Sequence, residues 1–290
     1  MNDIMFIINP VAGRGNGRRL ADFINKNAGS SFRPVFLVTE RKGDAGRFVK
    51  RGMEEGIRRF VAVGGDGTVN EVAAALVHTD GVLGIIPAGS GNGLARHLLI
   101  PLRVRGALQI IIEGSIMDID YGLLGKQAFF CVSGVGFDAT IGHAFEEASG
   151  RGLPGYVMAA VKEYFRYKPQ KYSLTIDGKR KIRRRAFLIT FANASQYGSN
   201  AYIAPEADVS DGLMDVCILH PFNIVKCLEI VYGLFGKKLS RSNLLEIIQC
   251  REVHLKRKKA GYIHYDGEPD RAGRKICVRL VERGLRVIVP

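Results

Sequence analysis

The chain lacks long apolar runs, paired cysteines and the commonest nucleotide-binding fingerprints, and each absence removes a class of protein. No segment approaches the ~18–20 consecutive apolar residues that a membrane-spanning helix needs. The five cysteines are widely spaced and form no CxxC pair, which excludes a zinc site of that type and favours reduced thiols in the cytosol. Neither GxxxxGK[ST] nor GxGxxG occurs, and no GxSxG spans Ser90, so a P-loop, a dinucleotide fingerprint and a hydrolase elbow are missing.

Acidic residues are the minority among the charged residues. Lys and Arg number 42 against 28 Asp and Glu, which gives a net charge of +14, and basic runs occur at residues 179–185 and 256–259. This balance predicts a polyanionic partner, either a nucleic acid, an anionic membrane surface or a phosphorylated ligand. Each run taken alone is equally well explained by the solvated face of a strand or hairpin. No nucleic-acid-binding motif is visible, so no nucleic-acid partner is expected.

The N-terminal part of the chain alternates short apolar runs with helical patterns. The first run has an acid at Asp3, which favours the first strand of the fold over a signal peptide. The pattern predicts strands at 4–8, 34–38, 60–63 and 82–86, and helices at 17–27, 44–53, 69–77, 94–99 and 104–113. Repeated βα units predict an α/β nucleotide-binding domain with a mostly parallel sheet over residues 1–118, with 281–290 as a candidate last strand.

After residue 118 the pattern changes to strand-like segments separated by Asp-Gly turns. Strands are predicted at 127–132, 172–176, 186–192, 213–219, 245–250, 252–255, 262–265 and 275–280, and helices at 137–147 continuing through 154–165 and at 223–234. Residues 119–280 are therefore expected to form a second, antiparallel β-sandwich domain. The two domains of such a protein are expected to meet in a cleft that holds the chemistry.

The most informative segment is the apolar run 60–63 with the glycines and the acid that follow it. Gly64, Gly65 and Gly67 surround Asp66 and lead into a predicted helix. A glycine turn at a helix start presents N–H groups to phosphate oxygens, which the helix dipole also favours. A carboxylate in such a loop repels phosphate unless it holds a cation or takes a proton, so Asp66 indicates phosphoryl transfer. The simpler alternative is a turn in which Asp66 caps the helix.

Three further loops follow predicted parallel strands. Residues 9–13 read Asn-Pro-Val-Ala-Gly, Thr39 precedes a Gly-Asp-Ala helix start at 43–45, and residues 87–96 read PAGSGNGLAR. The first loop is also explained as a plain turn, and Asp44 as a helix cap. The glycines around Ser90 form a second place where N–H groups converge, and two such loops on one sheet can hold one polyphosphate.

Acidic residues in the second half supply candidates for catalysis and metal binding. Asp266 and Glu268 lie on a predicted tight turn, and transfer to an alcohol needs a carboxylate that orients the hydroxyl and accepts its proton. A solvent-facing hairpin is the simpler explanation. Asp211 with flanking carbonyls could bind a hard divalent cation, whereas Asp208 and Asp215 are equally well explained as surface turn residues.

With these loops in order, the whole chain resembles the catalytic-domain family of diacylglycerol kinases, which includes soluble bacterial diacylglycerol kinases and sphingosine kinases. The resemblance rests on five motifs: NPVAG at 9–13, Thr39 with GDA at 43–45, GGDGTVNEV at 64–72, PAGSGNGLAR at 87–96 and DGE at 266–268. GGDGT alone also occurs in NAD kinases and phosphofructokinases, but the ordered set is specific.

The resemblance implies an NAD kinase/diacylglycerol kinase-like nucleotide domain, a C-terminal β-sandwich with the lipid site, and the cofactors ATP and Mg²⁺. It implies that Glu268 is the proton acceptor, with Asp66 a rival for that role and a helper in positioning Mg²⁺–ATP. The implied ATP-binding residues are Asn9, Pro10, Gly13, Thr39, Gly64, Gly65, Asp66, Gly67, Thr68, Asn70, Glu71, Gly89, Ser90, Gly91 and Asn92. A structural Mg²⁺ would lie at the Asp211 side chain and the carbonyls of Asp208 and Leu213.

One departure from the family pattern concerns the acceptor lipid. Bacterial diacylglycerol kinases usually have an aspartate after the asparagine of the second glycine loop, where this chain has Gly93. Its GSGNGLA is similar to the GSGNALA of sphingosine kinases, which opens the possibility of a long-chain base as acceptor. Asp138 lies where those kinases keep an acid that binds the polar head of the substrate. A helix N-cap is an equally good explanation of Asp138.

The sequence as a whole predicts an ATP- and Mg²⁺-dependent lipid kinase that acts on diacylglycerol or a sphingoid base. It is expected in the cytoplasm, in peripheral contact with an anionic membrane, and the sequence leaves open whether it forms a homodimer. Residues 222–235 or 156–167 would insert into the membrane, although a buried core helix is the simpler explanation of both. The alternatives are an NAD kinase-like enzyme and a non-catalytic protein that binds anionic lipid or nucleic acid.

Overall fold

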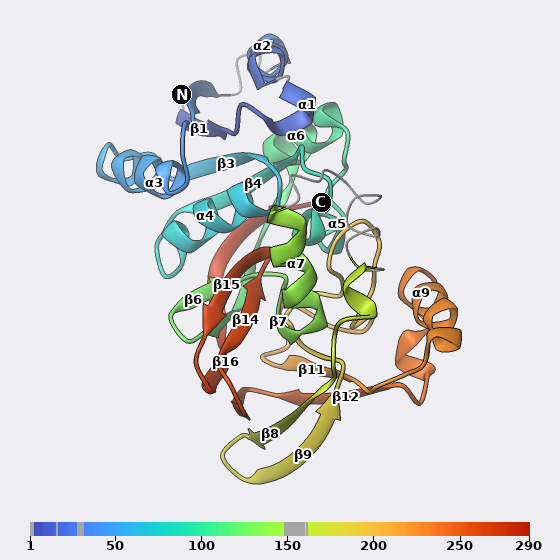
Figure 1. Ribbon diagram of the computed structural model, residues 1–290. Helices are drawn as coiled ribbons and strands as arrows, with labels where there is room; N and C mark the ends of the chain where they lie inside the picture. Colours follow the sequence, from blue (N-terminus) through green and yellow to red (C-terminus); the bar gives the residue numbers. More distant parts are fainter. Residues whose placement is uncertain (1–2, 16, 28–31, 148–159, 161) are drawn as a thin grey trace. The chain divides into compact units, whose positions relative to one another are not determined.

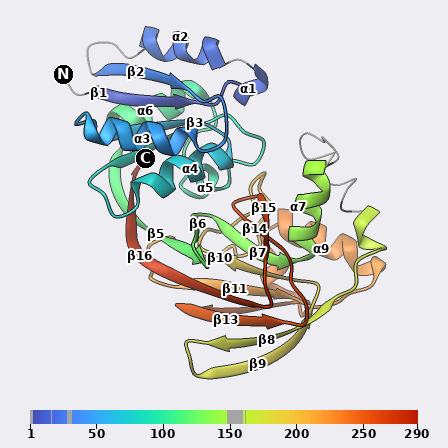
Figure 2. The ribbon, with the colours of Figure 1, turned by 60° about the vertical axis from the view of Figure 1, so that its left-hand side comes forward.

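The computed structural model describes residues 3–15, 17–27, 32–147, 160 and 162–290 (Figures 1 and 2). The chain divides into two compact units, unit 1 with residues 1–119 and 283–290, and unit 2 with residues 120–282. The last strand, β16 (Lys275–Val289), begins in unit 2 and ends in unit 1.

Unit 1 contains the predicted parallel sheet. The strands follow the order β2-β1-β3-β4 and then the C-terminal part of β16, and each neighbouring pair is parallel. Their bounds are β1 (Asp3–Ile8), β2 (Arg33–Val38), β3 (Arg59–Gly64) and β4 (Val82–Pro87). β3 and β4 are almost wholly buried, as continuous apolar runs in a parallel sheet require. The sheet confirms the α/β class of this part of the chain.

The helices of unit 1 lie between these strands in sequence. They are α1 (Ala12–Gly15), α2 (Gly17–Asn27), α3 (Asp44–Glu54), α4 (Asp66–Leu76), α5 (Gly93–His97) and α6 (Val104–Glu113). The prediction that the helix after the glycine loop starts at residue 69 was wrong, because α4 begins at Asp66. The acid therefore lies within the first helical turn, where the positive end of the helix dipole favours a negative charge.

Unit 2 contains two groups of antiparallel strands, as expected for the predicted β-sandwich. The first group joins the N-terminal part of β16 to β5 (Ser115–Leu124), β6 (Gln127–Phe129), β8 (Gln170–Ile176), β9 (Arg180–Ala186) and β13 (Glu252–Arg257). The second has the order β12-β11-β10-β7-β14-β15, with β7 (Val132–Gly136), β10 (Leu188–Ala192), β11 (Met214–Leu219), β12 (Leu245–Cys250), β14 (Gly261–Tyr265) and β15 (Glu268–Ala272).

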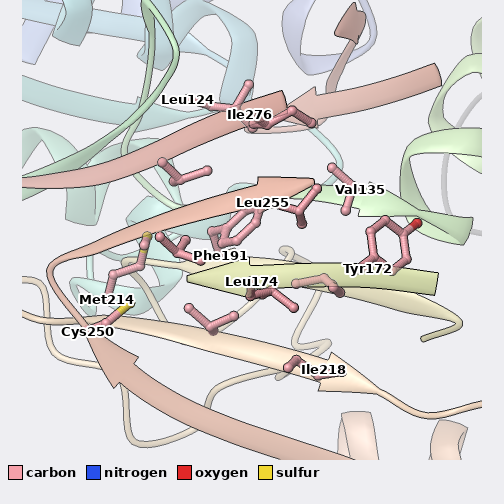
Figure 3. Packing of buried hydrophobic residues seen from close by; sticks show 14 of the residues in the cluster. Leu124, Val135, Tyr172, Leu174, Phe191, Met214, Ile218, Cys250, Leu255 and Ile276 are labelled. Carbon is pink, nitrogen blue, oxygen red and sulfur yellow. The ribbon is translucent and has the colours of Figure 1, made fainter. Parts of the chain in front are cut away.

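An apolar core lies within unit 2, and Figure 3 shows its side chains converging from both groups of strands. Leu174 of β8 and Leu255 of β13 come from one group, and Phe191 of β10 and Ile218 of β11 come from the other. All four are almost completely buried. Burial of one such side chain stabilises the fold by ~1.5–3 kcal/mol, so this cluster makes unit 2 a rigid support for the residues on its strands.

The helices of unit 2 agree in part with the predictions. α7 (Phe137–Glu147) forms as predicted, whereas most of its predicted continuation at 154–165 lies outside the described residues. The predicted helix at 223–234 appears as a 3₁₀ turn, η1 (Ile224–Lys226), followed by α9 (Cys227–Phe235), and a second turn, η2 (Leu239–Arg241), follows it. The explanation of 222–235 as a buried core helix was wrong, because α9 buries only Ile230 and Gly233.

Two predicted strands have different bounds from those expected. The strand predicted at 127–132 is divided into β6 and β7, because the N–H groups of Phe130, Cys131 and Val132 donate to the carboxylate of Asp266 instead of continuing one ladder. The segment 186–192 is likewise divided between the end of β9 and β10. Three further strands, β5, β9 and β15, were not predicted from the sequence.

Both basic runs overlap strands of unit 2. The first forms β9, at the end of its sheet path, where charged side chains discourage pairing with another chain. Its Arg184 forms two hydrogen bonds to Glu246, with nitrogen–oxygen distances of 2.7 and 2.9 Å. Arg257 of the second run is buried, and its guanidinium donates to the carbonyls of 261, 262, 272 and 273. These two arginines are therefore structural.

The Arg184–Glu246 pair predicts a pH-dependent contribution to stability. Arg184 lowers the pKa of the Glu246 carboxyl, so the stabilisation exists above the unfolded-state pKa of ~4.3 and is lost as the pH falls through the lower folded-state pKa. Glu246→Gln is expected to lower the free energy of unfolding by ~1 kcal/mol at pH 7 and to have no effect once the pH lies below the folded-state pKa of Glu246. Urea unfolding at several pH values measures this, with Glu55→Gln, in an exposed helical ion pair, as control. An equal loss at all pH values would contradict the assignment.

Candidate functional site

The loops after β1, β3 and β4 are tied together by backbone hydrogen bonds in unit 1. The Asn9 N–H donates to the carbonyl of Val63 at 3.0 Å, and the Gly13 N–H donates to the carbonyl of Ala88 at 2.9 Å. The Ala88 N–H in turn donates to the carbonyl of Gly64 at 2.8 Å. Because the carboxyl ends of parallel strands share one edge of the sheet, three of the predicted nucleotide-binding loops meet there.

The carboxylate of Asp66 joins the two glycine loops. Its Oδ2 accepts the N–H of Asn92 at 2.9 Å, and its Oδ1 accepts the N–H of Gly93 at 2.7 Å. Burial raises the pKa of this carboxyl, and the N–H groups of Gly93 and Asn92 and the charge of Arg96 act in the opposite direction. Asp66 therefore has a defined local role, which is to hold the second loop against the start of α4.

The two glycine loops approach each other so closely that side chains would not fit between them. A Cβ atom on Gly89 would lie 2.4 Å from the Cα of Gly65, and the reverse substitution would place a Cβ 3.1 Å from the Cα of Gly89. Asn92 closes the second loop on itself, since its side chain accepts the N–H of Gly89 at 2.9 Å and donates to the Gly89 carbonyl at 2.7 Å. Arg96 donates to the carbonyl of Gly91 at 3.0 Å.

Polar side chains from neighbouring elements support these loops. Asn9 donates to the hydroxyl of Thr68 at 3.3 Å, and both the N–H and the hydroxyl of Thr39 donate to the carbonyl of Ile8. Glu71 accepts the N–H of Gly43 at 3.0 Å and so connects α4 to the start of α3.

The remaining predicted nucleotide-binding residues lie on the same loops and helix. Pro10 and Ser90 are exposed, Gly67 is in the first turn of α4, and Asn70 is buried in that helix. The structure thus brings together all the residues that the sequence assigns to ATP, while their role in binding it stays a prediction.

The residues of unit 1 fit a polyphosphate. The first turn of α4, an eleven-residue helix, leaves N–H groups without intrahelical acceptors next to a loop made of glycines. Asp66 is the carboxylate at this position, and Mg²⁺ in kinases is usually held by one or two carboxylates together with substrate phosphates. Among the described residues, one group of three side chains has donor atoms close enough together to hold a metal ion. It consists of Glu252, His254 and Cys277, and it belongs to unit 2.

In unit 2 the predicted Asp-Gly turn forms between β14 and β15. Asp266 and Gly267 have φ angles of 47° and 86°, as a two-residue hairpin turn of type I′ requires, and Tyr265 pairs with Glu268 across it. The Asp266 carboxylate accepts three backbone N–H groups from residues 130–132. Asp266 therefore fixes the hairpin, and Glu268 is held as the first residue of β15.

Asp138 lies in a buried polar cluster at the start of α7. Its Oδ2 is 3.1 Å from the Nε2 of His264, and it accepts hydrogen bonds from Thr190 at 3.2 Å and Tyr197 at 3.5 Å. The side chains of Asp138 and His264 are 7% and 6% exposed. Gly134 makes room for the pair, since a Cβ there would lie 2.5 Å from the Asp138 carboxylate and 2.6 Å from His264. Asp138 thus does more than cap a helix.

The other members of this cluster carried no signal in the sequence. His264, Thr190 and Tyr197 come from separate strands and loops, and no spacing connects them to Asp138. The Nδ1 atom of His264 is buried and has no hydrogen-bond partner within the part of the chain that the structure describes. Only the fold brings these residues together.

The predicted structural metal site lies in a loop whose acids already have local partners. Asp208 accepts the N–H and hydroxyl of Ser210, and Asp211 accepts the N–H of Leu213 at 2.8 Å. Both carboxylates are exposed, as in ordinary surface turns. Asp215 nearby is buried, and burial raises the pKa of its carboxyl, to which the charge of Asp211 adds. Binding of Mg²⁺ by this loop stays a prediction.

Comparison with known proteins identifies the class of protein. Residues 3–124 match the model of the diacylglycerol kinase catalytic domain, and residues 131–289 match that of the YegS C-terminal NAD kinase beta sandwich-like domain. The chain therefore belongs to the YegS-like and diacylglycerol kinase family of lipid kinases. Membership of a kinase family implies the use of ATP.

Individual relatives agree with this assignment. A "Probable lipid kinase YegS-like" of Chromohalobacter salexigens is 30% identical over 239 residues, which cover 80% of this chain and 76% of the relative. A "Diacylglycerol kinase" of Mycobacterium tuberculosis is 28% identical over 257 residues, covering 86% and 83%. The crystal structure of a diacylglycerol kinase from Bacillus anthracis str. Sterne has a TM-score of 0.79 at 20% identity, covering 100% of this chain and 97% of that chain, and confirms the fold.

The two hydrogen bonds from residues 92 and 93 to the Asp66 carboxylate predict what happens when one of its oxygens is replaced. In Asp66→Asn an amide NH₂ would face one loop N–H, so the free energy of unfolding of unit 1 is expected to fall by ~2 kcal/mol. Hydrogen exchange at the N–H groups of Asn92 and Gly93 should also accelerate strongly. Asp80→Asn is the control, because Asp80 forms an exposed ion pair with Arg58 and should cost less than ~1 kcal/mol. Unchanged exchange at residues 92 and 93 would contradict the role given to Asp66.

Proposed function

We propose that this protein is an ATP- and Mg²⁺-dependent kinase that transfers the γ-phosphoryl group of ATP to a lipid hydroxyl. Membership of the lipid kinase family supports the reaction class. The observation that carries the proposal is the contact of two glycine loops, held by the Asp66 carboxylate at the carboxyl edge of a parallel sheet. Such an edge, with N–H groups at a helix start, suits the phosphates of a nucleotide.

Unit 1 would bind and orient the nucleotide. The N–H groups at the start of α4 and in residues 89–92 would bind phosphate oxygens, and Arg96 adds positive charge behind the second loop. Asp66 would help to hold Mg²⁺, which neutralises the charge of the phosphates when bound. In this class of reaction the protein acts mainly by positioning and electrostatic stabilisation, so the close packing of Gly65 and Gly89 is a functional requirement.

Glu268 is the better candidate for the proton acceptor. Both carboxylate oxygens of Asp66 already accept backbone N–H groups of residues 92 and 93, so this side chain is committed to holding the second glycine loop. Glu268 begins β15 directly after a turn that Asp266 fixes through three N–H groups. A carboxylate on a rigid hairpin can orient a hydroxyl group and accept its proton.

The cluster around Asp138 is the candidate site for the polar head of the acceptor. The Asp138 carboxylate accepts hydrogen bonds from Thr190 and Tyr197 and lies next to the Nε2 of His264. The buried Nδ1 of His264 is one group to which the acceptor lipid could form a hydrogen bond. A sphingoid base carries an ammonium group that would pair with the Asp138 carboxylate, whereas diacylglycerol offers only hydroxyl and ester oxygens. The chemistry of the cluster is compatible with either acceptor.

An anionic membrane is the proposed location of the acceptor. None of the helices in the described ranges is long and apolar enough to cross a bilayer. The net charge of +14 favours an anionic surface, to which each basic residue near the surface contributes ~1 kcal/mol.

A first prediction concerns ATP binding alone. Gly89→Ala would push the second loop away from Gly65, so ATP affinity is expected to fall by at least ~10-fold, which corresponds to ~1.4 kcal/mol. Calorimetric titration with ATP and Mg²⁺ measures this without any lipid. Gly46→Ala in α3 is the matched control, because its Cβ would make an ordinary contact of 3.7 Å with the Glu71 carbonyl and should leave affinity unchanged. Equal affinities of both variants would remove the two-loop site from the proposal.

A second prediction concerns the transfer step. Glu268→Gln should keep ATP affinity and lower kcat by at least ~100-fold, the usual effect of losing a general base. Asp270→Asn, on the same strand and exposed, should retain normal turnover. The assay uses labelled ATP, Mg²⁺ and total lipid, with mass spectrometry of the labelled product to separate phosphatidate from a sphingoid phosphate. Full activity of Glu268→Gln would exclude this residue as the base, and the absence of any labelled lipid from the wild-type protein would overturn the proposed function.

A further inference from the structure

The segment from η1 through α9 exposes a concentration of large apolar side chains. Six of the thirteen exposed large hydrophobic residues in the described part of the chain fall within residues 224–235, with 44–79% of their surface exposed. They are Ile224, Val225, Leu228, Val231, Tyr232 and Phe235. Single exposed apolar residues need no explanation, but a contiguous group of this kind marks an interaction site.

The exposed residues share one face of a helix that is attached to the unit by its other face. Val225, Leu228, Tyr232 and Phe235 are spaced by three, four and three positions, as neighbours on one helical face are. The opposite face buries Ile230 and Gly233, and a Cβ on Gly233 would lie 3.0 Å from the Cα of residue 239. α9, drawn in orange in Figure 1, is thus held in place with its apolar face turned to solvent.

Basic residues outnumber acidic ones in this segment. Residues 224–241 contain four basic residues, Lys226, Lys237, Lys238 and Arg241, and one acid, Glu229. The Glu229 carboxylate is already bound by Lys226 at 2.6 Å and by Ser242 at 2.7 Å.

The neighbouring lysines lie over aromatic rings. The Nζ atom of Lys237 lies 4.4 Å from the centroid of the Tyr202 ring, and that of Lys238 lies 5.5 Å from the centroid of the Tyr232 ring. An aromatic and aliphatic face with lysines at its border matches the boundary between the head groups and acyl chains of an anionic bilayer.

We infer that residues 224–241, called here the α9 surface, dock on an anionic lipid bilayer; this inference rests on the proposed lipid kinase function. The nine residues of α9 extend over ~14 Å, too short to cross a hydrocarbon layer of ~30 Å, so the helix lies along the interface. A second copy of the chain is a poorer occupant, because a two-fold contact would bring the basic borders of two copies together.

Tryptophan fluorescence tests the location of the contact, because the chain contains no tryptophan. Tyr232→Trp places the single fluorophore on the α9 surface, where the native side chain is 66% exposed, and Leu99→Trp places it at an apolar position of unit 1 that is 79% exposed. With vesicles of equal parts phosphatidylglycerol and phosphatidylcholine, and without nucleotide, the emission of Trp at 232 should shift to the blue and be quenched by brominated acyl chains. The emission at 99 should stay unchanged. An unshifted emission at 232 in protein that sediments with vesicles, or equal shifts at both positions, would overturn the inference.

Removal of the apolar side chains tests their contribution to binding. The double variant Val225→Ser/Leu228→Ser is expected to bind these vesicles at least ~10-fold more weakly than the wild-type protein. Leu99→Ser is the matched control, since Leu99 and Leu228 are both 79% exposed, and it should bind normally. Vesicles of phosphatidylcholine alone should bind both proteins weakly. Undiminished binding of the double variant would contradict docking through this face.

Two further measurements separate this inference from the proposed function. The double variant should phosphorylate a short-chain acceptor in detergent as fast as the wild-type protein, because the α9 surface contains none of the residues proposed for catalysis. A wild-type protein that binds vesicles through this face but phosphorylates no lipid would overturn the kinase proposal and leave the docking intact. Light scattering that shows a wild-type dimer and a monomeric double variant would instead assign the face to self-association and overturn lipid docking.

Discussion

The carboxylate of Asp66 is the interaction on which the candidate nucleotide site depends. It is one side chain that accepts N–H groups from two consecutive residues of another loop, at 2.9 and 2.7 Å. Charge-assisted bonds of this kind are stronger than neutral ones, and here they offset part of the cost of burying the acid. The negative charge of Asp66 therefore faces N–H groups of the protein's own backbone, which allows an acid to lie within a site that suits phosphate.

Unit 2 contains a similar arrangement around a different acid, Asp266. Asp266 accepts three backbone N–H groups and so fixes the hairpin that presents Glu268, just as Asp66 fixes the loop that presents Ser90. In both units a carboxylate next to a glycine organises the backbone beside a polar residue that is proposed for function. The motifs GDG and DGE are thus scaffolds as well as candidate functional groups.

Much of the fold could be predicted from the sequence, because buried parallel strands and glycine turns leave local patterns. The start of α4 was misplaced because Asp66 has both a turn propensity and a role in the first helical turn. The division of the strand at 127–132 depends on Asp266, more than 130 positions away, and no local pattern reports such a bond. The cluster of Asp138 with His264 was missed for the same reason, whereas the exposure of α9 contradicts its strongly apolar sequence.

The shared strand β16 has a consequence for how the chain acquires its structure. Unit 1 obtains its last strand from residues that follow the whole of unit 2, and Arg286 donates to the carbonyl of Asp80, 206 positions earlier. During synthesis the edge of β4 therefore stays unpaired until residues 283–290 have left the ribosome, and closing so long a loop is entropically slow. Until then the nascent chain exposes an unpaired strand edge, which is prone to pair with other chains. A chaperone that binds during this interval would protect the chain from aggregation.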